Sequence, residues 1–464
     1  MKNILIFGLA GVLVLLIAFA LPGMQRMEPV YVYAANGVVY YTNFTEPPRE
    51  VAKISARFPD GRSLSYFGLS SDGSLFFVGP EPNTTIVKRL DLRKGSEEII
   101  AEAEAGRFIF DIIVSDDGKW LAYEERNDCG SPENPPECIT DFVLVNVKTK
   151  EKTVFAGQRF PRGGLPEEFD SLVRFCADGN RIALSASKNI YKKSTERAPI
   201  VSTSLSFWDI SKKVPSESFL VTNYHASSAL DFEEVLLDFD RLSPDCESYI
   251  TYIQENPDNN KEIVTHKVVD RRTGVATPLY ELPKDGIPLL SSFRFGVSGE
   301  QVIAKQWEKR DLSGASRYRP QMFGVALIDS NNPRTLTVYP NEMVSLKDGV
   351  HVHYIPGAPP GFSDAMTLAP DGSRLVYPVY EPTLSLTGIA TFDVATKRVE
   401  PVRKDSISLE VKDRAAQCLG IERASRVKGT EANLSLCQDG WREEFEEAYQ
   451  KGADRVIPIG WTSI

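Results

Sequence analysis

A ten-residue pattern recurs along this chain, and it constrains the fold more than any other feature. It reads VSDDGKWLAY at residues 114–123 and LAPDGSRLVY at 368–377. Three related copies are LSSDGSLFFV at 69–78, FCADGNRIAL at 175–184 and LSPDCESYIT at 242–251. The segment GVSGEQVIA at 296–304 is a sixth, decayed copy. Because such repetition indicates one supersecondary unit per copy, we expect six similar units.

Each copy predicts a tight turn that leads into a strand covered on both faces. Glycine adopts positive φ without steric cost, and an Asp side chain accepts hydrogen bonds from the backbone two residues on. Four residues after the aspartate stand Phe76, Leu121, Ile182, Tyr249 and Leu375, and five after it stand Phe77, Ala122, Ala183, Ile250 and Val376. Neighbouring side chains of a strand point to opposite faces, so both faces must be buried.

A second pattern follows each copy: a β-rich run ending in Asp or Asn, a turn, and another β-rich run. Examples are FVLVNVKTKEKTVF at 142–155 and GIATFDVATKRVEPV at 388–402. Every unit therefore predicts four strands, and four-stranded sheets stacked radially form a β-propeller. We predict an all-β propeller of six or seven four-stranded blades, with strands in 31–56 closing the ring together with strands from the other end of the chain. A solenoid or a sandwich is the competing architecture.

The motif S-[PD]-D-G-x-x-L-x-Y, followed by an Asp-x-x-[TS]-[GK] turn, resembles the WD-like β-propeller repeats of TolB-type proteins. The resemblance covers residues 64–403. It implies the propeller fold and a partner-binding role. It does not transfer the partner of TolB, because the separate N-terminal domain of TolB is not recognisable in this sequence.

Both ends of the chain lie outside the repeats, which gives three predicted regions. The uncharged run from Ile4 to Leu21 reaches roughly 27 Å as a helix, close to the thickness of a bilayer core. The small residues around Ala20 also fit a signal cleavage site, so residues 1–25 are an uncleaved anchor or a signal peptide. Residues 26–404 form the propeller, and 405–464 form a small, partly helical α/β appendage whose final strand docks on it. We expect a single-pass protein of the cell membrane with an extracytoplasmic bulk, or a periplasmic or secreted protein after cleavage.

The six cysteines fit an exported chain. Cys129 and Cys138 bracket one loop, and Cys418 and Cys437 flank a second local segment, so each pair is expected to form a disulfide. Tight CxxC pairs typical of zinc sites are absent from the sequence. Cys176 and Cys246 remain, and we expect both to be buried thiols.

Two short segments carry candidate metal ligands. His351 and His353 in VHVHY share one face of an extended strand, as a two-ligand site requires. Asp238 and Asp240 in LDFDRL also share a face and could bind a divalent cation in the propeller channel. The alternative is that all four side chains are solvated. No catalytic residue and no organic cofactor are predicted.

The net charge and the absence of catalytic motifs reduce the number of function classes that the sequence allows. A net charge of −10 disfavours nucleic-acid binding. No G-x-S-x-G elbow occurs, and Asp117 and Gly118 are adjacent, unlike in a sialidase Asp-box. Long inter-strand segments such as 131–137 and 188–199 combine turn residues with Tyr, Arg or charged residues, which suits protein contacts. We therefore predict a non-catalytic protein- or ligand-binding module at the cell envelope. The alternative is an envelope hydrolase or lyase that uses channel-lining acids or histidines.

Overall fold

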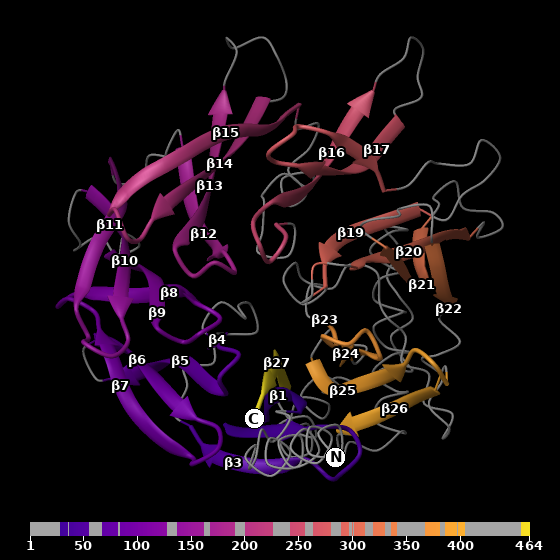
Figure 1. Ribbon diagram of the computed structural model, residues 1–464, viewed down its shortest axis with the longest axis horizontal. Coiled ribbons are helices and arrows are strands. Elements are labelled where there is room, and N and C mark those ends of the chain that lie inside the picture. The colour runs from indigo at the N-terminus through magenta and orange to yellow at the C-terminus, as the bar shows by residue number, and fades with distance from the viewer. Residues whose placement is uncertain are drawn as a thin grey trace, which may run out of the picture.

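The secondary structure is confined to strands, turns and bridges in the part of the chain that the computed structural model describes (Figure 1). The described residues are 28–35, 37–54, 67–81, 84–127, 137–161, 168–190, 200–225, 242–255, 263–279, 289–296, 299, 301–310, 319–329, 336–340, 367–380, 386–396, 398–403 and 456–464. The predicted N-terminal helix and the predicted helical part of the appendage lie outside them. Within the described segments, no helix is long and apolar enough to span a membrane.

The described strands form seven antiparallel sheets around a common centre, which defines a β-propeller (Figure 1). Blade 1 consists of β4(Phe67–Leu69), β5(Ser74–Glu81), β6(Thr84–Asp91) and β7(Ser96–Glu102). Blade 2 consists of β8(Arg107–Val114), β9(Trp120–Asn127), β10(Glu137–Asn146) and β11(Lys152–Pro161). Blade 3 consists of β12(Glu168–Phe175), β13(Arg181–Ile190), β14(Ile200–Asp209) and β15(Val214–His225).

The remaining repeats continue the same meander order. Blade 4 has β16(Ser248–Glu255), β17(Ile263–Asp270) and β18(Ala276–Pro278), and an isolated bridge joins Leu242 to Tyr249 at the place of an innermost strand. Blade 5 has β19(Leu289–Phe295), β20(Gln301–Arg310), β21(Arg319–Asp329) and β22(Leu336–Pro340). Blade 6 has β23(Thr367–Leu368), β24(Arg374–Tyr380), β25(Leu386–Asp393) and β26(Arg398–Arg403). Each of the six repeats thus supplies one sheet.

The two ends of the chain supply the seventh sheet. Blade 7 contains β27(Val456–Ser463), β1(Pro29–Ala35), β2(Val38–Thr42) and β3(Arg49–Lys53) in that order. β27 pairs antiparallel with β1, with Tyr31 opposite Trp461. The Thr462 hydroxyl also donates to the Ser70 carbonyl of the first repeat at 2.7 Å. The predicted docking of the final strand and the closure of the ring by both termini are confirmed.

The Asp-Gly turns have the predicted hydrogen bonds. Asp117 accepts from the Lys119 amide at 3.1 Å, and Asp371 accepts from the Ser373 amide at 3.0 Å. One detail of the sequence alignment is wrong: the first copy is shorter by one residue. β9 pairs Val114 with Leu121, whereas β5 pairs Leu69 with Leu75, so Leu75 and not Phe76 is the counterpart of Leu121.

Both faces of the second strand are buried, as the repeats predict. Leu121 packs in an apolar cluster with Phe76 of blade 1. Ala122, its neighbour, packs in another cluster with Ile182 of blade 3. All four side chains are fully buried. The apolar pairs of the repeat therefore form the seams between blades, where most of the hydrophobic stabilisation arises.

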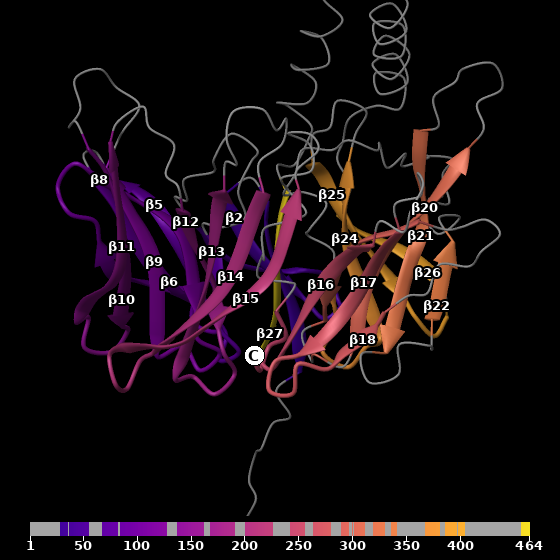
Figure 2. The same ribbon diagram turned by 90° about the horizontal axis from the view of Figure 1, so that it is seen from above.

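The two rims of the propeller differ. We call one rim the turn rim, because it contains the short turns that connect the first strand of a blade to the second and the third strand to the fourth. These turns lie along one edge in Figure 2. Its turns in blades 2 and 3 comprise residues 115–119, 147–151, 176–180 and 210–213. We call the opposite rim the loop rim. It contains the connections from the second strand of a blade to the third and from each blade to the next. In blades 2 to 5 the second-to-third connections comprise residues 128–136, 191–199, 256–262 and 311–318.

Candidate functional site

The residues predicted as metal ligands and most of the predicted disulfide cysteines are not in the described segments. Asp238, Asp240, His351 and His353 all lie outside them, as do Cys129, Cys418 and Cys437. Cys138 on β10 is disulfide-bonded. Because its predicted partner, Cys129, is not among the described residues, the pairing of these two cysteines stays a prediction. No group of three or more potential metal ligands occurs in the described part of the chain.

The charged side chains at the loop-rim end of blade 2 are a feature that the sequence reasoning missed. β9 begins with the continuous apolar and aromatic residues 120–123 and continues as Glu124-Glu125-Arg126. Because both faces of this strand are covered by neighbouring blades, its two consecutive glutamates are both buried, with 0% and 3% exposure. The signal was present in the sequence: two acids inside a strand already predicted to be buried on both faces.

Glu125 faces blade 1 and is well supplied with partners. It accepts a hydrogen bond from the Glu104 amide at 2.9 Å, and Arg107 lies 3.9 Å away. Asp141 stands opposite Glu125 on β10 and binds Arg107 at 2.5 Å. Arg159 lies 3.6 Å from the other oxygen of Asp141. These buried ion pairs lie within blade 2, and the Glu104 amide links them to the connection between blades 1 and 2.

Glu124 faces blade 3 and is less well supplied. One carboxylate oxygen pairs with Arg126, whereas Oε1 has no hydrogen-bond partner among the described atoms. Asp111 on β8, with φ of 39° at a β-bulge, lies 3.9 Å from the same arginine. Burial, followed by the charge of Asp111, raises the pKa of Glu124 to about 7, although Arg126 opposes the shift. Glu124 is therefore a buried carboxyl group that titrates near neutral pH.

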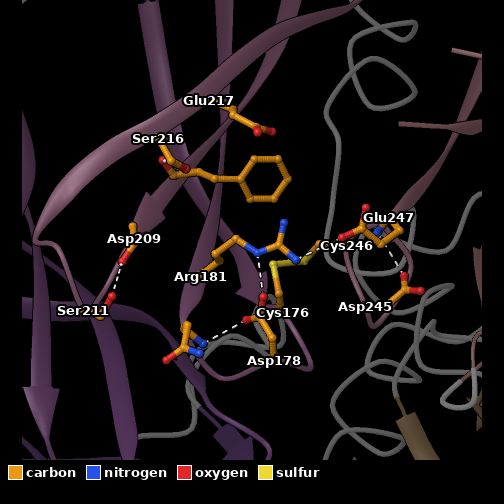
Figure 3. Close-up of polar contacts among 12 residues, drawn as sticks. Cys176, Asp178, Arg181, Asp209, Ser211, Ser216, Glu217, Asp245, Cys246 and Glu247 are labelled. Atoms are coloured by element: carbon orange, nitrogen blue, oxygen red, sulfur yellow. Dashed lines mark hydrogen bonds and ion pairs between the residues drawn. A yellow bond between two sulfur atoms is a disulfide. The ribbon is translucent and has the colours of Figure 1, made fainter. Parts of the chain in front are cut away.

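The seam between blades 3 and 4 contains a disulfide between Cys176 and Cys246, with Cα atoms 5.3 Å apart (Figure 3). Both cysteines are buried as predicted, but the prediction that they are thiols is wrong. Cys246, with φ of 62°, takes the place of glycine in its turn, and Cys176 takes the place of a serine in the preceding copy. Two departures in adjacent copies of one motif were the signal for this bond.

An ion-pair cluster flanks the disulfide at the turn rim. Glu247 receives hydrogen bonds from Arg181 at 3.0 Å, Arg271 at 2.9 Å and Arg272 at 2.8 Å. The contact with Arg272 is the largest cause that lowers the pKa of Glu247, to about 2. Figure 3 shows Arg181 of blade 3 beside the Cys176–Cys246 bond, where it contacts Asp178 and Glu247. These contacts join two blades and leave the carboxylate fully ionised at neutral pH.

Chemically, Glu124 is the described residue closest to what acid–base catalysis needs, since the most effective catalytic pKa lies near the working pH. Its side chain is fully buried, however, so a substrate would first meet Arg126, which is 41% exposed. The arrangement supports proton uptake inside a seam more directly than turnover of a bound molecule.

Comparisons with known proteins find distant similarity to solved structures. No protein-family model matches the chain, and no curated protein matches it. The β-propeller domain of the trilobed protease from Pyrococcus furiosus is 13% identical, with TM-score 0.45, over 81% of this chain and 92% of that one. An oligogalacturonate lyase in complex with manganese is 13% identical, with TM-score 0.44, over 74% and 79%. TolB from Acinetobacter baumannii is 14% identical, with TM-score 0.31, over 69% and 65%.

The chain is a β-propeller, and TolB is among the solved structures to which it is similar. Similarity at these identities and TM-scores carries no functional information. The fold assignment rests on the seven sheets of the chain itself.

Proposed function

We propose that this chain is a non-catalytic propeller that binds a protein or peptide partner through its loop rim, outside the cytoplasmic membrane. The observation that carries the proposal is the difference between the two rims. Turns such as 115–119 are short and closed by hydrogen bonds, for example from the Gly118 amide to the Ser115 carbonyl at 2.8 Å. The loop-rim connections of blades 2 to 5 are longer and vary in sequence, and loops on a rigid scaffold are where recognition residues concentrate.

Export is part of the same proposal. The Cys176–Cys246 bond is typical of oxidising compartments, and the apolar run from Ile4 to Leu21 is long enough to anchor the chain. Sequencing the N-terminus of the mature protein tests the anchor. A start at Met1 supports an uncleaved single span, and a start just after Ala20 shows a cleaved signal and a soluble envelope protein.

The rim assignment is tested by shortening one connection at a time. Blade 1 joins its second and third strands through residues 82–83 alone, so a two-residue turn is compatible with this position. Replacing 191–199 with Asn-Gly, and 256–262 likewise in a separate variant, should reduce cross-linked partner capture from envelope extracts by about tenfold or more in at least one case. The matched control is Lys212→Ala on the turn rim, which should capture the same partner normally.

The result separates binding from catalysis. The proposal would be overturned if both variants with a shortened loop still captured the partner and Lys212→Ala on the turn rim did not. The rival envelope hydrolase or lyase would instead show turnover on a substrate panel that disappears with Asp238→Ala or His353→Ala.

A further inference from the structure

The seam between blades 2 and 3 lacks a contact that its two neighbours have. At the turn rim, the Ser71 amide donates to the Asp116 carbonyl at 2.8 Å across blades 1 and 2. The Ala177 amide donates to the Pro244 carbonyl at 2.9 Å across blades 3 and 4. Among the described backbone hydrogen bonds, none joins Asp116 to Ala177 across blades 2 and 3.

The glycines of these turns show the same difference. A Cβ on Gly118 would lie 3.1 Å from the Asp72 carboxylate of blade 1, so those turns are packed together. A Cβ on Gly179 would meet nothing within 4 Å. The Asp-Gly turns of blades 2 and 3 are therefore not packed together as those of blades 1 and 2 are, and the turn-rim ion pair between these blades joins Lys213 to Glu151, 4.0 Å apart, in the neighbouring turns.

The middle of the same seam is closed by apolar packing. Ala122, Phe142 and Phe155 of blade 2 form one buried cluster with Ile182 and Leu184 of blade 3. This packing extends to the turn rim through Ile210 and leaves the loop-rim end, where Glu124 lies, as the end of the interface with a buried carboxyl group.

The groups around Glu124 come from each element packed against it. β8 contributes Asp111, β9 contributes Arg126, and β10 places Phe142 directly opposite in the sheet. From blade 3, β12 contributes the backbone amide of Leu172, whose hydrogen bond, like Arg126, lowers the pKa of Glu124 and opposes the larger effect of burial. Asp111 and Arg126 are the charged side chains among these described groups, and Arg126 lies close to both acids. Arg126, which is half-exposed, is thus the cation near both Glu124 and Asp111. Glu124 is fully buried, and its Oε1 has no hydrogen-bond partner among the described atoms.

We propose that Glu124, with Asp111 and Arg126, forms a proton-operated latch between blades 2 and 3, closed when Glu124 is protonated and weakened when it ionises. The protonated carboxyl group is neutral in its buried site and does not repel Asp111. Ionisation places a second negative charge beside Asp111 in a site without water access for Oε1. That charge is costly because burial penalises it and one arginine is shared.

The direction with pH follows from the pKa of Glu124, which is about 7 in the folded protein against 4.5 for the free side chain. The folded state therefore binds more protons than the unfolded state between these values. The contribution to stability is complete below pH 4.5 and is lost as the pH rises through 7. A propeller with this latch is tighter in mildly acidic than in mildly alkaline surroundings.

Hydrogen–deuterium exchange of the full chain tests the latch. Amides of β9 and β12, corrected for the intrinsic pH dependence of exchange, should lose protection by about tenfold or more between pH 5.5 and pH 8.5. Glu124→Gln, which keeps the size and remains neutral, should keep protection nearly constant over this range. Glu125→Gln is the matched control because it is the next residue on the opposite face, and it should retain the pH dependence of the wild type.

Two results would overturn the proposal. One is protection at β9 and β12 that does not change with pH in the wild-type protein. The other is a pH dependence that persists in Glu124→Gln. Should Glu124→Gln fail to fold, the wild type still decides, because isotope-edited infrared spectroscopy of glutamate-labelled protein must show one buried carboxyl group losing its proton near pH 7.

Discussion

Blade 3 is held on its two sides by different chemistry. Towards blade 2 it faces Glu124, a fully buried carboxyl group with one arginine and one competing acid. Towards blade 4 it faces Glu247, whose side chain is 18% exposed and binds three arginines. The pKa of Glu124 is raised to about 7, and the pKa of Glu247 is lowered to about 2.

The difference shows that the repeated turn specifies a blade but not the strength of the seam beside it. Turns from the same motif touch through Ala177 and Pro244 on one side of blade 3 and do not touch on the other. In the fourth copy of the motif, Cys246 replaces glycine and Glu247 follows it. These two residues join blades 3 and 4 by a disulfide and by ion pairs, which we call the clasp. The neighbouring junction relies on apolar packing and on a carboxyl group that changes charge near neutral pH.

Removing the covalent part of the clasp should have the largest effect on this comparison. The double variant Cys176→Ser with Cys246→Gly restores the residues of the common turn and opens a disulfide that links positions separated by 70 residues. Loop-closure entropy gives a loss of about 4 kcal/mol in the free energy of unfolding. Urea unfolding measures it, and wild-type protein under reductant should approach the same value. An unchanged midpoint would show that the arginine cluster alone holds this junction.

Removing the ionic part should have a smaller effect, with a pH dependence opposite in sign to that of Glu124. Because the pKa of Glu247 is depressed to about 2 in the folded state, its contribution is present above pH 4.5 and is lost as the pH falls through 2. Glu247→Gln should therefore lower the stability by about 2 kcal/mol at pH 7 and flatten the loss between pH 4.5 and pH 2. Thermal melts across this range measure both. A variant that loses stability equally at pH 2 and pH 7 would contradict the electrostatic origin.

The two seams of blade 3 also differ in how far the sequence could predict them. The Asp-Gly turns and the apolar pair after them predicted the propeller and the burial of both faces, because these requirements are local and recur in every blade. The Cys176–Cys246 bond was missed because it joins residues 70 positions apart that meet only when consecutive turns stack. The partners of Glu124 come from β8, β9 and β12, and the β-bulge that brings Asp111 near Arg126 has no sequence signature of its own.

The smallest expected effect concerns the turns themselves and separates the cost of a strained backbone from the cost of lost packing. Gly118 and Gly179 have nearly the same φ, 66° and 67°, so replacing either with alanine should cost about 1 kcal/mol for the left-handed backbone alone. Only at Gly118 does the new Cβ approach Asp72, which accepts from the Ser70 hydroxyl and must move. Gly118→Ala should therefore be less stable than Gly179→Ala by about a further 1 kcal/mol, measured as the difference in urea midpoints at equal slope. Equal losses would mean that contact between consecutive Asp-Gly turns adds nothing to the stability of a seam.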